Sequence, residues 1–235
     1  MIKLSGKVAL VTGGSVGTRL ARAFLEAGCK VALVYRNPAR GNELDKEFAS
    51  YSGAFLPLQA DLSNFKDAKS AVNSVRSKFG RIDFLLNSLG GWIGGKKLHE
   101  HTTSELQKMF SIDVVPTFNV MSQVLPVMAE GKFGRVVNFI SLQVFGNGAG
   151  NSIYAASKSA VLALSKAAAE EYKNSGISVY TIAPSTIDTE NNRKAMPKAD
   201  TSKWVKIEEI VDATLFLCAA GDSLNGTILK FPGKL

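Results

Sequence analysis

The sequence is poor in cysteine and histidine. Of its 235 residues, two are cysteine and two are histidine. Cys29 and Cys218 lie far apart in apolar surroundings with a helical pattern. We therefore expect reduced core thiols, as in a cytoplasmic protein, rather than a disulfide framework. His99 and His101 lie beside a glycine-rich loop, and we interpret them as loop residues, so no metal site is predicted.

Long hydrophobic runs and blocks of like charge are also missing. No apolar run reaches the roughly 18 residues that a membrane-spanning helix needs, so we expect no membrane partner. The net charge is +8, but the 28 basic residues are scattered, which favours a solvated surface over nucleic-acid binding. Such a surface would steer an anionic cofactor or substrate. With no linker or repeat, residues 1–235 are predicted to form a single domain.

Short apolar runs alternate with segments of helical pattern. The predicted strands are 7–12, 30–35, 54–59, 82–87, 134–140, 177–182 and 226–231. The predicted helices are 17–28, 38–51, 64–78, 102–130, 152–174 and 207–219. The strands are apolar nearly throughout, as strands buried on both faces are. The pattern predicts an α/β fold, a single doubly wound (Rossmann) domain whose seven-stranded parallel sheet has helices on both faces.

Ligands of such sheets bind at the carboxyl ends of the strands. The segment "VTGGSVGTR", residues 11–19, follows the first strand and opens a helix. Gly13 and Gly17 allow a tight turn that approaches a pyrophosphate, and the helix N-terminus offers free N–H groups. Arg19 stands where a third glycine would normally allow close packing. Either the helix is displaced there, or the guanidinium reaches towards phosphate.

The second predicted strand ends without an acidic residue that could accept a hydrogen bond from a ribose 2′-hydroxyl. Arg36 stands there instead and is placed to pair with a 2′-phosphate. NADP(H) is therefore favoured, and NAD(H) is the alternative. Asp61 follows the third strand and is a candidate acceptor for the adenine amino group.

Taken together, these motifs resemble the short-chain dehydrogenase/reductase family over essentially the full length. The motifs that match are Thr12-Gly13 with Gly17, Asp61, Asn87-Ser88-Leu89-Gly90, Ser141, Tyr154 with Lys158, and Pro184-Ser185 where the family has Pro-Gly. The resemblance implies that the cofactor is bound by Thr12, Gly13, Ser15, Val16, Gly17, Arg36, Asp61, Leu62, Asn87, Gly90, Tyr154, Lys158, Pro184 and Thr186.

The catalytic chemistry that the resemblance implies centres on a tyrosine. Tyr154 and Lys158 are four positions apart, which places them on one helix face. A free phenol titrates near pH ~10, and a neighbouring ammonium favours its ionised form. Tyr154 is then the general acid/base at the substrate oxygen, and Lys158 also holds the nicotinamide ribose. Ser141, thirteen residues before the tyrosine, would hydrogen-bond the same oxygen.

One catalytic position departs from the family. The family's fourth catalytic residue is an Asn at a helix kink, where a freed main-chain carbonyl holds a water of the proton relay; here it falls on Asp113. Pro116 lies three residues on and cannot donate to the carbonyl of Ile112, so we expect it to bend the helix. Asp113 is then either a member of the relay or a polar residue that fills the space.

Two segments resemble a narrower group. "GGWIGG" (90–95) and residues 187–204 look like dihydropteridine reductases, which also have an Arg at the position of Arg19. Those enzymes lack the serine that Ser141 supplies and generally use NADH, and bacterial 3-oxoacyl-acyl-carrier-protein reductases are the other near kin. Trp92 and Met196 are candidates for lining the substrate pocket.

The leading hypothesis is therefore NAD(P)H-dependent reduction of a carbonyl to an alcohol. A small molecule such as a 3-oxoacyl thioester would be the substrate, with acyl carrier protein as a partner in that case. A quinonoid dihydropteridine reductase is the alternative within the class, and a non-catalytic nucleotide-binding regulator is the alternative outside it. The resemblance also implies a homodimer or homotetramer whose interface is formed by helices 102–130 and 152–174.

Overall fold

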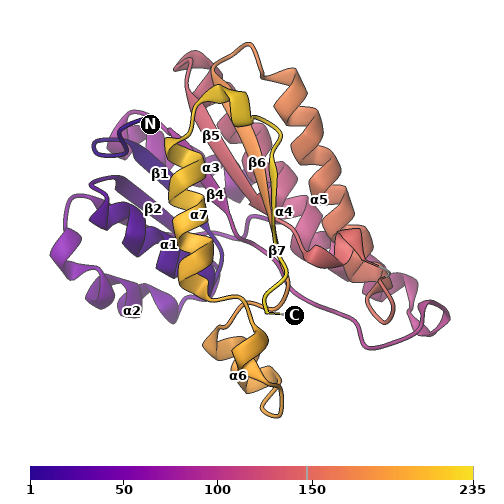
Figure 1. Ribbon diagram of the computed structural model, residues 1–235. Coiled ribbons are helices and arrows are strands. Elements are labelled where there is room, and N and C mark those ends of the chain that lie inside the picture. Colours follow the sequence, from indigo (N-terminus) through magenta and orange to yellow (C-terminus); the bar gives the residue numbers. More distant parts are fainter. Residues whose placement is uncertain (147, 235) are drawn as a thin grey trace.

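The computed structural model describes residues 1–146 and 148–234, and it alternates strands with helices (Figure 1). The strands are β1 (Val8–Thr12), β2 (Lys30–Tyr35), β3 (Phe55–Gln59), β4 (Phe84–Asn87), β5 (Gly134–Phe139), β6 (Ile177–Pro184) and β7 (Ile228–Phe231). The α-helices are α1 (Ser15–Glu26), α2 (Arg40–Glu47), α3 (Phe65–Phe79), α4 (Thr103–Glu130), α5 (Ser152–Glu171), α6 (Glu190–Ala195) and α7 (Ile207–Ala219). The strand order is β3-β2-β1-β4-β5-β6-β7, with parallel pairing throughout, which confirms the predicted fold class.

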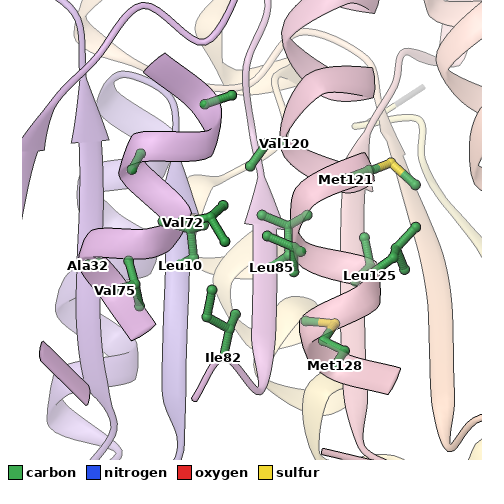
Figure 2. Packing of buried hydrophobic residues seen from close by; sticks show 14 of the residues in the cluster. Leu10, Ala32, Val72, Val75, Ile82, Leu85, Val120, Met121, Leu125 and Met128 are labelled. Carbon is green, nitrogen blue, oxygen red and sulfur yellow. The ribbon is translucent and has the colours of Figure 1, made fainter. Parts of the chain in front are cut away.

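Helices cover both faces of the sheet, so the central strands are buried on both sides. One core cluster joins the sheet to α3, α4 and α5, and a second joins it to α1, α2 and α7. Figure 2 shows the first cluster, in which Leu10 and Leu85 of the sheet face Val72 of α3 and Leu125 of α4. This two-sided burial explains why the strand sequences are apolar rather than alternating.

Two helical segments differ from the predicted ones. The helix predicted at 38–51 ends at Glu47, and residues Ala49–Tyr51 form a separate 3₁₀ turn. Phe48 lies between them, and its buried ring stacks on Phe55 with centroids 4.3 Å apart. The six-residue α6, which was not predicted, is capped by Thr189 and is too short for a helical period to show in the sequence.

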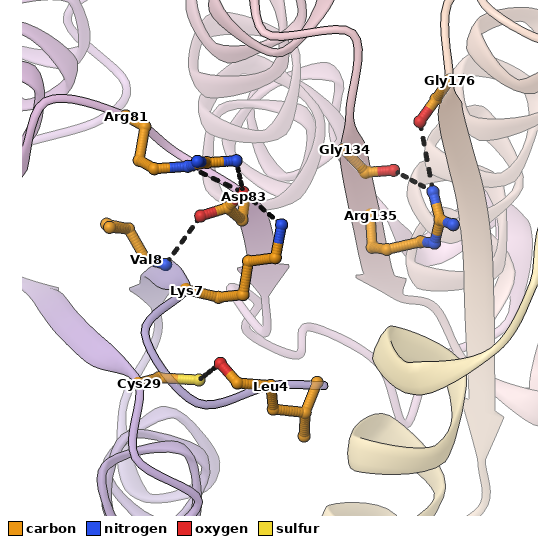
Figure 3. Close-up of polar contacts among 9 residues, drawn as sticks. All are labelled: Leu4, Lys7, Val8, Cys29, Arg81, Asp83, Gly134, Arg135 and Gly176. Carbon is orange, nitrogen blue, oxygen red and sulfur yellow. Dashed lines mark hydrogen bonds and ion pairs between the residues drawn. The ribbon is translucent and has the colours of Figure 1, made fainter. Parts of the chain in front are cut away.

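The amino ends of the strands carry a network of charged residues that is far from the predicted ligand edge (Figure 3). Asp83 is fully buried there, and its carboxylate accepts a hydrogen bond from the amide of Val8 at 2.9 Å. The same carboxylate pairs with Lys7 and Arg81. Arg135 is likewise buried, and its guanidinium donates to the carbonyl of Gly134. These contacts hold neighbouring elements together at the amino ends of the strands. The predicted ligand-binding edge is at the opposite, carboxyl ends.

The two cysteines are buried and unpaired, but the prediction of helical surroundings is wrong for one of them. Cys218 lies in α7, whereas Cys29 follows the turn between α1 and β2. The thiol of Cys29 donates to the carbonyl of Leu4 at 3.2 Å. Burial, aided by the nearby charge of Asp83, raises the pKa of Cys29 to about 12, so this thiol stays protonated.

Among the described helices, α4 is the one that is long and apolar enough to span a membrane by length and composition. Half of its apolar window is buried inside the domain, where the helix packs between α3 and α5. This is the pattern of a core helix. The helix begins with a capping box of Thr102 and Glu105 and continues through Pro116 and Pro126.

Candidate active site

The carboxyl ends of β1, β4 and β5 are joined by a chain of buried polar side chains. The hydroxyl of Thr12 donates to Oδ1 of Asn87 at 2.7 Å. The amide of Asn87 donates to Oδ1 of Asn138 at 3.2 Å, and Asn138 donates to Ser165 of α5 at 2.9 Å. Each strand end is therefore held against the next, which fixes the loops that follow.

The turn after β1 has the shape that the glycine motif predicts. Gly13 has φ of 116°, and a side chain there would collide with Ser88. At Gly17 an added Cβ would lie 3.0 Å from the carbonyl oxygen of Thr12. In the described part of the chain, no side chain caps the N-terminus of α1, which begins at Ser15 and continues with Val16. Its first amides are thus available to a pyrophosphate, and the cradle fits a dinucleotide.

Arg36 and Asp61 lie within electrostatic reach of each other at the ends of β2 and β3. Hydrogen bonds from Ser63 lower the pKa of Asp61, and the charge of Arg36 lowers it further. Arg36 itself is exposed. Beside this corner, the amide of Asn119 donates to the carbonyl of Leu62 at 2.9 Å and holds the loop in place.

A second arginine, which the sequence analysis did not select, faces the glycine turn. Arg40 opens α2, and its guanidinium donates to the hydroxyl of Thr18 at 3.0 Å. Its sequence position, four residues after Arg36, was the signal that could have found it. Two guanidiniums thus lie near the end of β2, the predicted place of a 2′-phosphate.

Arg19 turns away from the phosphate site. Its guanidinium pairs with Glu208 of α7 at 2.6 Å, and both side chains are at least half exposed. Of the two alternatives drawn from the sequence, reaching for phosphate is therefore not the one observed. The arginine instead links α1 to the start of α7.

Lys158 is almost completely buried beneath the loop that follows β4. Its ammonium donates to the carbonyl oxygens of Leu89 at 3.2 Å and Phe139 at 3.4 Å. Gly90 lies against it, and an added Cβ there would lie 2.7 Å from the lysine Nζ, so a side chain at this position would displace the ammonium. Burial lowers the pKa of Lys158, and the carboxylate of Asp113 opposes that shift.

Tyr154 lies one turn before Lys158 on α5, and the side chain of Ser141 lies close enough to act on its pKa. Ser141 comes directly after β5 and caps the short 3₁₀ helix Leu142–Phe145. Burial raises the pKa of Tyr154; the nearby Ser141 hydroxyl lowers it, and the charge of Asp113 raises it. The phenol therefore carries its proton at neutral pH and can donate it.

Asp113 joins this cluster from α4 and is fully buried. Its Oδ1 lies 3.5 Å from the ammonium of Lys158 and accepts a hydrogen bond from the amide of Gly91 at 3.1 Å. Its Oδ2 accepts from the hydroxyl of Ser157 at 2.7 Å. The carboxylate therefore contacts the predicted catalytic lysine directly.

Trp92 projects from the glycine-rich loop after β4 and is 61% exposed. Its indole N–H donates to Oδ1 of Asn151 at 2.8 Å, three residues before Tyr154. An added Cβ at Gly94 would lie 2.8 Å from the indole, so the glycine lets the ring lie close to the loop. The Asn151 contact, which no local sequence pattern predicts, holds Trp92 near the start of α5.

The segment after β6 forms the remaining side of this edge. Pro184 ends β6 and is buried, and the carbonyl of Thr186 accepts from the amide of Val205 at 2.9 Å. In the sequence, α6 lies between Thr186 and Val205. In Figure 1 it projects from the rest of the domain. Met196, which follows α6, is 39% exposed. The described contacts do not bring it to Tyr154.

Within residues 1–146 and 148–234, no group of three or more His, Cys, Asp or Glu side chains could hold a metal ion. His101 has a local role instead. Its Nδ1 lies 3.4 Å from Glu105, the residue that completes the capping box of α4.

Comparison with known proteins gives one consistent family. The family model described as short chain dehydrogenase matches residues 7–200. D-threitol dehydrogenase of Mycolicibacterium smegmatis is 30% identical over 98% of this chain and 93% of its own. The 3-hydroxyacyl-CoA dehydrogenase type-2 of Bos taurus is 31% identical over 79% of this chain and 75% of its own. The solved structure of ElxO with NADP bound superposes with a TM-score of 0.89 at 25% identity, covering 96% of each chain.

Proposed function

This chain belongs to the short-chain dehydrogenase family and is an NAD(P)-dependent oxidoreductase, and on that premise we propose that it reduces a small ketone or 3-oxoacyl thioester with NADPH. The observation that carries the proposal is the placement of the Ser141 side chain beside Tyr154, one helical turn before the buried Lys158. Two hydroxyl groups thus converge where one substrate oxygen would lie.

When bound, the nicotinamide cofactor would supply the hydride. Tyr154 gives its proton to the substrate oxygen as negative charge develops there, and Ser141 donates a second hydrogen bond to the same oxygen. Lys158 stabilises the tyrosinate left behind, and its position beneath the loop at Gly90 suits contact with the nicotinamide ribose. The glycine turn with Thr12 and Asn87 would hold the rest of the cofactor.

The preference for NADPH rests on the corner at the end of β2. Arg36 follows the strand, and Arg40 lies against the glycine turn through Thr18. A 2′-phosphate in this corner would meet two guanidiniums, whereas the ribose of NADH would find no acid to accept its hydroxyl. The NADP seen in ElxO supports this assignment.

Reduction of a carbonyl suits Ser141 better than reduction of a pterin. A ketone develops an alkoxide in the transition state, so a second hydroxyl donor lowers its barrier. The names of two relatives, a D-threitol dehydrogenase and a 3-hydroxyacyl-CoA dehydrogenase, also refer to hydroxyl-bearing substrates. If the substrate is carried on a protein, an acyl carrier protein would be the partner.

A quinonoid dihydropteridine is the second candidate substrate, and Trp92 is the observation that favours it. Its exposed indole, held by Asn151, offers a flat surface on which a conjugated ring could stack. Trp92 would line the pocket in either case, and Met196 of the 187–204 segment is the second candidate for lining it.

A panel of substrates separates these proposals. Wild-type protein is mixed with NADPH or NADH and with 3-oxoacyl thioesters, small ketones or quinonoid dihydropteridine, and cofactor oxidation is followed by absorbance. We expect the carbonyl substrates to turn over best with NADPH. Tight NADPH binding without turnover of any substrate would instead favour a regulatory, non-catalytic protein.

We also propose that the chain forms a homodimer or homotetramer through α4 and α5. The outer surface of α4 leaves apolar side chains open to solvent, with Val115 at 38% and Phe118 at 51% exposure. On α5 the outward positions include the small residues Ala163 and Ala167, which would allow close packing of helices. Burial of this surface against a second copy would remove it from water.

A further inference from the structure

We infer that Asp113 is a positioning residue whose fixed negative charge holds the Lys158 ammonium in place and sets the upper pH limit of carbonyl reduction. The inference rests on the proposed function, because it concerns the same site. It departs from the family pattern, in which this position is a neutral Asn.

The contacts of Asp113 suit an ionised carboxylate. Both oxygens accept from donors: Oδ1 from the amide of Gly91 and Oδ2 from the hydroxyl of Ser157. The ammonium of Lys158 lies 3.5 Å from Oδ1. The Asp113 side chain is fully buried, and a buried charge is stable only when it is paired and hydrogen-bonded. Asp113 and Lys158 therefore depend on each other.

An Asn at position 113 could keep this geometry and lose only the charge. Its oxygen could still accept from Gly91 and approach Lys158. Its amide could donate to the hydroxyl of Ser157, which would then use its own proton on the carbonyl of Tyr154, 2.8 Å away. The Asp113→Asn variant thus removes the negative charge at position 113 while it keeps the shape of the side chain.

The charged and titratable groups of this cluster come from two helices. Asp113 lies on α4, and Tyr154 and Lys158 lie on α5. The packed strand ends contribute uncharged groups: the carbonyls of Leu89 and Phe139 and the hydroxyl of Ser141.

The direction of the effect follows from these positions. The Asp113 charge raises the pKa of Lys158 against the effect of burial, and it adds to the raised pKa of Tyr154. Its removal lowers both pKa values. Reduction needs the phenol and the ammonium protonated, so either change makes activity fail at a lower pH.

The test is the pH profile of kcat/KM for carbonyl reduction in wild type, Asp113→Asn and Ser157→Ala. We expect the alkaline limb in Asp113→Asn to move down by about one pH unit or more. In Ser157→Ala the carboxylate keeps its charge, paired with Lys158, so the limb should move less than in Asp113→Asn. An unchanged limb in Asp113→Asn, with a reduced rate alone, would overturn the inference and leave Asp113 as a space-filling residue.

A titration of the free protein separates this inference from the proposed function. The phenolate absorbance of wild type minus that of Tyr154→Phe reports Tyr154 ionisation without any substrate. We expect ionisation above the ordinary value near pH ~10 in wild type, and at a lower pH in Asp113→Asn. Ionisation of wild-type Tyr154 below that value contradicts the inference even if Asp113→Asn does not fold. Failure of every carbonyl substrate would refute the proposed function but leave this titration interpretable.

Discussion

The hydroxyl of Thr12 donates to the side-chain carbonyl of Asn87 at 2.7 Å, which joins the ends of two neighbouring strands beneath the cofactor site. Both residues are buried. Asn87 also donates onward to Asn138 at 3.2 Å. These hydrogen bonds are therefore expected to stabilise the sheet as well as to hold its predicted ligand-binding edge in place.

Removal of this link is expected to destabilise the fold. Asn87→Ala leaves the hydroxyl of Thr12 and the side-chain carbonyl of Asn138 buried without their hydrogen-bond partner. We therefore expect the free energy of unfolding to fall by about 1–3 kcal/mol. The free energy of unfolding is measured by urea denaturation. Asn73→Ala, at an exposed position on α3, is the control and should change stability by less than about 0.5 kcal/mol. Equal stability of the two variants would show that the polar chain contributes little.

Loss of the Tyr154 hydroxyl is expected to stop catalysis without loss of the cofactor. Tyr154→Phe removes the proton donor, so kcat should fall by at least ~10²-fold, while NADPH binding by fluorescence stays close to wild type. Tyr172→Phe, at the end of the same helix, serves as the control. Nearly wild-type turnover in the Tyr154→Phe variant would refute the assignment.

The arginines at the end of β2 are expected to select NADPH over NADH. In Arg36→Ala the affinity for NADPH should fall by about 10–10²-fold, the scale of a lost charge-assisted hydrogen bond, while the affinity for NADH changes little. Arg40→Ala should act in the same direction. Arg76→Ala removes a guanidinium paired with Glu130 at the far end of α3 and is the control. Equal loss of both cofactors would argue against recognition of the 2′-phosphate.

The exposed surface of α4 is expected to form the interface between copies. Phe118→Asp places a charge on that surface and should shift the protein from dimer or tetramer to smaller species in light scattering at micromolar concentration. Leu98→Asp changes an exposed apolar residue outside α4 and α5 and should leave the assembly unchanged. A monomeric wild-type protein would contradict the proposed assembly.

Much of the architecture could be predicted because it depends on short-range patterns in the sequence. Strands buried on both faces have continuous apolar runs, and the glycine turn and the Tyr154–Lys158 spacing are short-range patterns. All seven predicted strands are present, with bounds that differ by a few residues. The strand order is one that is typical of the predicted fold class.

The contacts that were missed join residues far apart in the chain. Arg19 pairs with Glu208 across two helices, and Trp92 bonds to Asn151 across two loops. Local periodicity carries no information about such pairs, because they depend on how whole elements pack. The direct contact of Asp113 with Lys158 is of the same kind, so the sequence could only leave its role open.

The measurement that tests the account most directly compares two substrates in wild type and Ser141→Ala. Initial rates of NADPH oxidation are recorded with a 3-oxoacyl thioester and with quinonoid dihydropteridine. We predict that wild type reduces the thioester faster, and that Ser141→Ala lowers this rate by about 10²–10³-fold, the effect of one lost oxyanion donor. Fast reduction of the dihydropteridine, at a rate that Ser141→Ala leaves unchanged, would contradict the account and identify a pterin reductase in which Ser141 is incidental.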